Sequence, residues 1–183
     1  LSHATNSVGM KEATLLAKER MLEIQRRVTE GRTPGIHTGL EGLDRMTGGM
    51  MPGTLNVIAA RPRVGKTAFA LFMALNAARN GHPVCLYSLE MSKEQLVFRL
   101  LGCIADIEPS KILKGTLSAP EMKRIQRASD ELERLPIWID ERTDLSVADL
   151  RYQISLRRKQ GRCEMVIVDY LQPVSYTHLT LPT

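Results

Sequence analysis

The 183-residue sequence has few cysteines and few aromatic residues, and both shortages narrow the classes of protein it can belong to. Its three cysteines, Cys85, Cys103 and Cys163, are widely spaced and include no CxxC pair. An odd number at such spacing favours reduced thiols over a disulfide framework or a zinc site. Aromatic residues make up only 4% of the chain, so a stacking platform for single-stranded bases is not visible in the sequence.

Long apolar runs are also lacking. No stretch approaches the ~20 apolar residues that cross a bilayer. The first ten residues, LSHATNSVGM, have neither the basic segment nor the apolar core of a secretory signal. We therefore expect a cytoplasmic protein with no membrane partner. Its length suggests one domain with an appendage.

The chain carries a formal charge of +5, which is compatible with a nucleic-acid partner without being diagnostic. Much of this charge lies in one predicted helical segment, at Arg151, Arg157, Arg158, Lys159 and Arg162. A solvated helix face explains this run at least as well as contact with DNA does.

The most informative stretch, residues 56–67, reads NVIAARPRVGKT. In a phosphate-binding P-loop, backbone N–H groups point at the phosphates, a lysine reaches the β- and γ-oxygens, and a hydroxyl binds Mg²⁺. Gly65, Lys66 and Thr67 supply the ending of that motif, while Ala60 stands where the usual pattern has glycine. The ending alone is also compatible with an ordinary turn that carries a surface lysine.

The surroundings of this stretch favour the P-loop. Residues 55–60 read as a buried strand and residues 68–76 as a helix buried on most faces, which is the strand, loop and helix order that the motif requires. The helix N-terminus adds a partial positive charge where the phosphates would lie. The residues that we expect to bind nucleotide are Arg61, Pro62, Arg63, Val64, Gly65, Lys66, Thr67 and Ala68. The side chain of Arg63 could face nucleotide, water or a neighbouring subunit.

Strands and helices alternate along the rest of the chain. Apolar runs predict strands at residues 83–89, 136–140 and 165–168. Helices are predicted to begin at Ser92, Pro109, Ser118 and Val147. The two serines are each followed three residues later by Gln or Glu, the spacing of a capping box. This alternation predicts an α/β fold, with a parallel sheet covered by helices on both faces and ligands at the carboxyl ends of the strands.

Acidic residues follow three of the predicted strands. Glu90 comes just after the second strand, where a general base could deprotonate water. Asp169 follows four apolar residues, as in a Walker B strand that holds Mg²⁺ through its water shell. Taken alone, Glu90 is also compatible with a helix cap or a solvated residue, and Asp169 with a turn residue. Asp140 and Glu141 follow the third strand and are weaker candidates.

A charged amphipathic helix is predicted for residues 11–29, ending at Gly31. The following RTPGIHTGL has the composition of a linker, so the helix is an appendage on a short tether. Its apolar stripe consists of Ala17, Met21, Ile24 and Val28. From spacing alone, this stripe can pack on a partner or fold back on its own domain.

Four sequence blocks together resemble the ATPase domain of DnaB-type replicative DNA helicases. They are TGLEGLDRMTGG (38–49), AARPRVGKTAFAL (59–71), SLEMSKEQLVFRL (88–100) and VIVDYLQ (166–172). The similarity covers residues 35–172 and is more specific than a bare P-loop, because SLEMS and DYLQ are distinctive and in the expected order.

This resemblance implies a RecA-like fold, ATP and Mg²⁺ as cofactors, and a homohexameric ring that moves along single-stranded DNA at a replication fork. It also implies a primase and a helicase loader as partners. Lys66 would contact the β/γ-phosphates, Thr67 and Asp169 would organise Mg²⁺, and Glu90 would be the base for the attacking water. The first helix resembles the linker helix that packs on a neighbouring subunit. Arg63, where the family usually has a small residue, is a departure.

The resemblance divides the chain into a linker helix with its tether (1–34), an incomplete RecA-like domain (35–172) and a tail unlike the family (173–183). After DYLQ the family continues with a strand that lies between the Walker B and P-loop strands, with DNA-binding loops and with an arginine finger. We expect a truncated or spliced end here. The alternatives are a RecA-like recombinase, a clock-type assembly ATPase, or a nucleotide-binding fragment without turnover.

Overall fold

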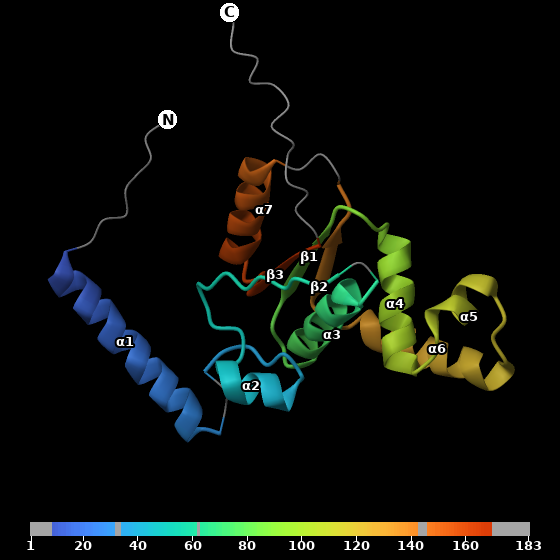
Figure 1. The fold of residues 1–183 in the computed structure, drawn as a ribbon, viewed down its shortest axis with the longest axis horizontal. Helices are drawn as coiled ribbons and strands as arrows, with labels where there is room; N and C mark the ends of the chain where they lie inside the picture. The colour runs from blue at the N-terminus through green and yellow to red at the C-terminus, as the bar shows by residue number, and fades with distance from the viewer. Residues whose placement is uncertain (1–8, 32–33, 62, 143–145, 170–183) are drawn as a thin grey trace, which may run out of the picture. The chain divides into compact units, whose positions relative to one another are not determined.

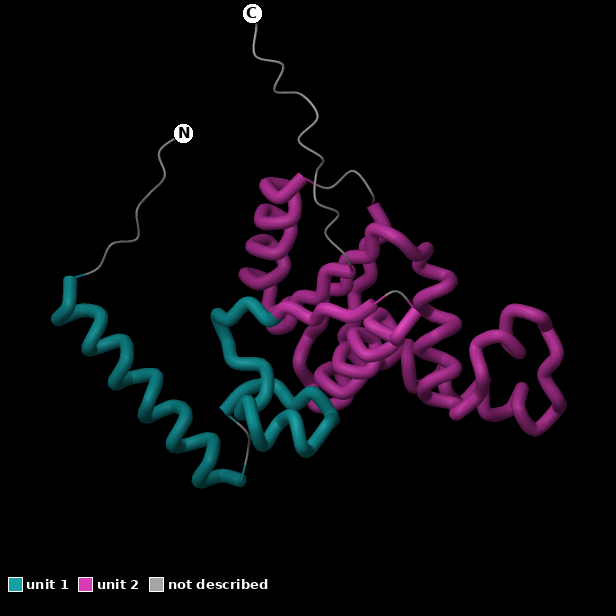
Figure 2. Tube along the Cα trace, viewed as in Figure 1, with its two compact units in different colours: residues 1–56 teal, residues 57–183 magenta. Residues whose placement is uncertain are grey.

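A computed structural model describes residues 9–31, 34–61, 63–142 and 146–169 of the chain. These residues form two compact units, residues 1–56 and residues 57–183, which are coloured separately in Figure 2. The expected domain boundary near residue 34 stays a prediction. Pro62, the last residues of the DYLQ block and the tail lie outside the described residues.

The second unit is built on a parallel sheet (Figure 1). β1 (Val84–Ser88) lies between β2 (Ile137–Asp140) and β3 (Met165–Asp169), with Val84 opposite Ile137 on one side and Met165 on the other. The helices of this unit are α3 (Lys66–Arg79), α4 (Lys93–Ala105), α5 (Pro109–Lys114), α6 (Ala119–Leu132) and α7 (Val147–Lys159). The predicted alternation of strands and helices is confirmed from α3 to β3.

Helices cover both faces of the sheet. Every residue of β1 is buried, so neither face of the central strand meets solvent. On one face, Cys85 and Tyr87 pack with Leu150 and Ile154 of α7. α3 contacts β1 and β3 and buries a run of small and apolar side chains, so it covers the other face. This two-sided burial explains why the β1 sequence, VCLYS, is apolar rather than alternating.

Serine caps set the starts of α4, α6 and α7. Ser92, Ser118 and Ser146 each accept a hydrogen bond from the backbone N–H three residues on, and the side chain at that position bonds back to the serine. These reciprocal bonds satisfy N–H groups that a helix start leaves unpaired. The two capping boxes predicted from spacing are confirmed, and the one at Ser146 was not predicted.

The helices α4, α5 and α6 form a separate small core. Leu101, Ala105, Ile107 and Ala128 are buried together, with Phe98 and other apolar side chains packed around them. This cluster lies between the helices rather than against the sheet, so α5 and α6 extend to one side of the unit in Figure 1.

The predicted strand at residues 55–60 is wrong. These residues have no strand conformation, and the side chains of Leu55 and Val57 are 90% and 81% exposed. A strand requires a hydrogen-bonded neighbour, and the family resemblance puts a further strand between this one and β3. Within the described residues, nothing pairs with residues 57–60 or with the outer edge of β3. An apolar run without that neighbour has no ladder to join.

The first unit holds α1 (Met10–Thr29) and α2 (Glu41–Thr47). α1 confirms the predicted first helix, and it buries no residue: Met21 and Val28 of its apolar stripe are exposed. Charged residues interrupt its apolar positions. Within the described ranges, no helix is both long and apolar enough to cross a membrane.

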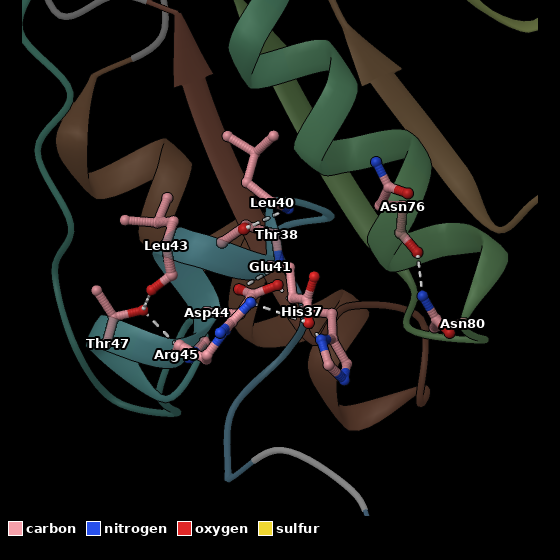
Figure 3. A network of polar contacts seen from close by, with 11 residues as sticks. His37, Thr38, Leu40, Glu41, Leu43, Asp44, Arg45, Thr47, Asn76 and Asn80 are labelled. Atoms are coloured by element: carbon pink, nitrogen blue, oxygen red, sulfur yellow. Dashed lines mark hydrogen bonds and ion pairs between the residues drawn. The ribbon is translucent and has the colours of Figure 1, made fainter.

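A buried carboxylate organises the rest of the first unit (Figure 3). Asp44 of α2 accepts a hydrogen bond from the Thr38 backbone N–H at 2.9 Å and lies 3.3 Å from His37 Nδ1. Burial alone would raise the pKa of Asp44, but the hydrogen bonds from Thr38 and His37 outweigh it and hold the pKa below its ordinary value. Ile36 and Met50 close the unit by pairing as an antiparallel bridge.

Glycines permit the close backbone approach at this bridge. A Cβ on Gly35 would lie 2.6 Å from the Met50 carbonyl oxygen, and one on Gly49 would lie 2.7 Å from that of Ile36. Both distances are shorter than real Cβ contacts. Gly35 and Gly49 are therefore needed for packing.

We expect Leu86→Ala to lower the free energy of unfolding by about 2–5 kcal/mol, because Leu86 is 1% exposed at the centre of the sheet and its truncation leaves a cavity. Val166→Ala on β3, where the side chain is 37% exposed, should change it by less than about 0.5 kcal/mol. Urea unfolding followed by circular dichroism measures both. An equal loss of stability in the two variants would contradict the assignment of Leu86 to the core.

Asp44→Asn should lower stability at neutral pH by roughly 1–3 kcal/mol, because it removes a charge that accepts buried hydrogen bonds. Since the folded-state pKa of Asp44 is lowered, its contribution is present above the unfolded-state pKa near 3.8 and is lost as the pH falls through the folded value. The stability difference between the wild-type protein and Asp44→Asn should therefore disappear in acid. Glu41→Gln, which changes an exposed carboxylate on the same helix, is the control. A stability difference that does not change with pH would contradict this role of the Asp44 carboxylate.

Candidate functional site

The carboxylate of Asp169 joins the end of β3 to the start of α3. Thr67 Oγ1 donates a hydrogen bond to Asp169 Oδ2 at 2.5 Å, and Lys66 Nζ lies 3.3 Å from Asp169 Oδ1. Asp169 is 5% exposed, while the Lys66 side chain keeps about a third of its surface in solvent. A buried carboxylate requires partners of this kind, because burial without them is costly. Three residues predicted from the sequence are thus brought together, with Thr67 and Asp169 separated by 102 positions in the chain.

The loop before α3 has an unusual backbone. Gly65 is the N-cap of α3 with φ 108° and ψ 21°, a conformation open to glycine and strained for other residues. Arg63 also has a positive φ, 66°, without being glycine. The Val64 N–H donates to the Arg61 carbonyl at 3.3 Å, which closes a turn. Successive backbone groups in such turns form concave sites that bind anions.

The start of α3 lacks the side-chain cap that the other long helices of this unit have. Its N-cap is Gly65, which has no side chain to accept a hydrogen bond, whereas α4, α6 and α7 each have a capping serine. Arg61, Arg63, Val64, Gly65 and Ala68 are exposed around this end. A helix start with a glycine N-cap, a positive dipole end and a lysine is suited to a phosphate group.

Glu90 lies at the same edge of the sheet. Ser88 of β1 is opposite Asp169 of β3, and the Leu89 N–H donates to the Asp169 carbonyl at 2.9 Å. Ser88 Oγ donates to the Met91 carbonyl at 2.8 Å and accepts from the Met91 N–H at 3.1 Å. These bonds close a turn around Glu90, whose side chain is exposed. Glu90 is therefore held beside the end of β3 and open to solvent.

Sequence reasoning missed the role of Ser88. The serine was part of a recognised block, but no function was expected of it. It is 1% exposed, and both its hydroxyl bonds go to Met91. The available signal was a polar residue at the end of an otherwise apolar strand, just before an acidic candidate.

The acids after β2 have structural partners instead. Asp140 accepts from the Arg142 guanidinium at 2.6 Å, and this bond lowers the pKa of Asp140. Glu141 accepts from the Lys93 backbone N–H at 2.8 Å and pairs with Lys93 Nζ at 2.9 Å, and both contacts lower the pKa of Glu141. Glu141 thereby supports the start of α4. Because Asp140 and Glu141 both have structural partners, they are weaker catalytic candidates than Glu90.

The residues near Asp169 fit a magnesium ion that also binds nucleotide. In the part of the chain that the structure describes, no group of three or more His, Cys, Asp or Glu side chains could hold a metal by itself. Mg²⁺ usually takes one or two carboxylates and completes its shell with waters and substrate phosphates. The Asp169 carboxylate with the Thr67 hydroxyl beside it is such a partial donor set.

The chain is similar to known proteins of one family. Residues 35–180 match the family model described as the DnaB-like helicase C-terminal domain. The chain is 42% identical over 143 residues to the replicative DNA helicase DnaB of Synechocystis, a match that covers 76% of this chain and 16% of that protein. The match to the DnaB helicase of Geobacillus stearothermophilus is 38% identical over 144 residues, with coverages of 78% and 32%.

Solved structures give the same result. The chain matches a solved structure described as an ATPase domain with a TM-score of 0.77 and 29% identity, over 94% of this chain and 61% of that one. It matches a DnaB-like replicative helicase, described with its primase interactions, with a TM-score of 0.75 and 29% identity, over 94% and 42%. The expected α/β, RecA-like fold is confirmed.

The chain spans only about a sixth to a third of the length of the curated relatives described above. Within that span, the family model covers most of the chain, including both the Lys66–Thr67 loop and Asp169. The family expected from the four sequence blocks is therefore confirmed: the chain belongs to the DnaB-like helicase C-terminal domain family.

Proposed function

We propose that this chain is the nucleotide-binding part of a replicative DNA helicase, in which ATP hydrolysis drives movement along single-stranded DNA and unwinding of the duplex. The observation that carries the proposal is the meeting of Lys66, Thr67 and Asp169 at an uncapped helix start. The relatives' names, replicative DNA helicases, supply the reaction to which this site would be coupled.

Each residue would have one task in this site. Backbone N–H groups of the loop and of the start of α3 would bind phosphate oxygens. Lys66, now paired with Asp169, would move its ammonium to the β/γ-phosphates, and Thr67 and Asp169 would turn their oxygens to Mg²⁺. The bound ion would neutralise charge on the phosphates. The self-paired arrangement keeps the buried Asp169 carboxylate satisfied until then.

Glu90 would orient and deprotonate the attacking water. Its side chain is exposed, yet its backbone is held in the Ser88–Met91 turn beside Asp169. A general base must lie within reach of both water and phosphate, which this edge of the sheet allows. Arg61, Pro62, Arg63, Val64, Gly65 and Ala68 would complete the phosphate-binding loop.

The partners of the whole protein follow from the same proposal. They are single-stranded DNA at the fork, further copies of the same subunit in a homohexamer, a primase and a helicase loader, in the cytoplasm. A primase is named with one structural relative. The exposed apolar stripe of α1 supports its proposed role as a linker helix that packs on a neighbouring subunit.

Lys66→Ala should weaken nucleotide binding about 10–100-fold, because it removes a charged donor to the phosphates. Asp169→Asn should remove the benefit of Mg²⁺, and in EDTA should bind nucleotide at least as well as wild type, since a nearby negative charge is gone. Titration with a fluorescent ATP analogue measures both. Glu141→Gln is the control, a carboxylate at a strand end with a structural partner. Equal effects of Asp169→Asn and Glu141→Gln would contradict the site.

Glu90→Gln should leave nucleotide binding intact and reduce the hydrolysis rate about 10²–10⁴-fold, the usual contribution of a positioned general base. Steady-state ATPase assays on the complete helicase, with and without single-stranded DNA, provide the measurement. A Glu90→Gln protein with unchanged turnover would exclude Glu90 as the base, and DNA-stimulated turnover without strand separation would favour a recombinase or assembly ATPase.

A further inference from the structure

We propose that the solvent-facing side of α7, with Arg162 just after it, binds the phosphate backbone of a single nucleic-acid strand. The inference rests on the proposed function, because it assigns a surface for one of the partners named there. This surface is separate from the nucleotide site: α7 packs on one face of the sheet, and Arg162 precedes the start of β3, whereas Asp169 ends that strand.

The charge of this segment is of one sign. Residues 150–163 contain five basic side chains and no Asp or Glu. The five are Arg151, Arg157, Arg158, Lys159 and Arg162. None of them forms an ion pair with another residue in the described ranges, whereas Arg20, Arg79 and Lys93 elsewhere each have a carboxylate partner.

The carboxylates that flank the segment are engaged elsewhere. Asp149 accepts from Ser146 in the capping box of α7. Glu164 lies 2.7 Å from His82 Nδ1. These hydrogen bonds do not remove the negative charge of either acid, but the five basic side chains outnumber the two acids, so the positive potential of this face is available to a polyanion.

The inner and outer sides of α7 differ. Leu150 and Ile154 face the sheet and pack on Cys85 and Tyr87. Arg151 and Arg158 lie three and four residues from Ile154 and so flank the packed side, whereas Tyr152 and Lys159 lie on the opposite side; all four are exposed. Arg157 is half-buried on the side of Leu150 and Ile154, and the other four basic side chains are exposed.

The helix dipole explains only part of this pattern. Cations in the last turn, such as Arg157 to Lys159, are favoured by the negative end of the dipole. The effect falls off within one turn, so it gives no reason for Arg151, which lies near the other end of α7. It also gives none for Tyr152, an aromatic side chain that is 67% exposed among the cations.

Tyr152 favours a single strand over a duplex. Aromatic side chains beside a basic track bind unpaired bases by stacking, and every base has a face to stack. In a duplex the bases are stacked on one another, and only phosphates would meet this surface. From Arg151 to Lys159 the helix rises about 12 Å, which is enough for roughly three or four stacked nucleotides.

Fluorescence anisotropy with a labelled oligo-dT of about 20 nucleotides tests the proposal on the full 183-residue chain, with salt varied between about 50 and 200 mM. Arg151→Gln combined with Arg158→Gln should weaken binding about tenfold and reduce the salt slope by about 1.4, or 0.7 for each lost phosphate contact. Lys123→Gln combined with Arg127→Gln, two exposed cations on α6, removes the same charge and is the matched control. Equal losses in the two double variants, or none, would overturn the proposal.

Tyr152→Ala should weaken oligo-dT binding about tenfold and leave duplex binding unchanged. Equal affinity for the duplex with no effect of Tyr152→Ala would overturn the single-strand assignment. Competition by anionic lipid vesicles as strong as by oligo-dT would also contradict a nucleic-acid partner.

Binding of a fluorescent ATP analogue separates this inference from the proposed function. The α7 double variant should bind the analogue like wild type. A wild-type chain that binds oligo-dT but not the analogue would refute the nucleotide site and leave the α7 surface standing; the reverse result would refute the surface alone. Circular dichroism of each variant shows whether it is folded.

Discussion

The buried carboxylate of Asp169 is the point on which the rest of this structure depends. It ends β3, receives the Thr67 hydroxyl at 2.5 Å and lies 3.3 Å from the Lys66 ammonium, so it ties the sheet to the start of α3. A charge buried to this extent is tolerated only with such partners. The same two partners are those that a phosphate and a metal ion would need, so in the proposed function folding and nucleotide binding would use one set of groups.

The surrounding elements hold this point in place. β1 is buried on both faces and pairs with β3 up to Asp169, which brings the Ser88–Met91 turn and Glu90 to the same edge. α3 starts without a side-chain cap, whereas α4, α6 and α7 have serine caps. The glycine-capped start of α3 is where the proposed phosphate site lies, at the positive end of the helix dipole.

Much of this arrangement was predictable because the signals are local. Capping boxes at Ser92 and Ser118 depend on residues three apart, and strand and helix periods can be read directly. The failure at residues 55–60 has the opposite cause: a strand exists only with a neighbour, and an apolar run cannot show whether one pairs with it. The roles of Ser88 and Asp44 were likewise invisible, because each depends on contacts formed only after the chain turns back. Lys66, Thr67 and Asp169 were found because the motif carries its own context.

A structure determined with Mg²⁺ and a non-hydrolysable ATP analogue tests the central claim most directly. The account predicts that Lys66 Nζ leaves Asp169 and contacts the β/γ-phosphates, and that the oxygens of Thr67 and Asp169 face the metal ion. Phosphates bound elsewhere, with the 3.3 Å Lys66–Asp169 ion pair intact, would contradict it.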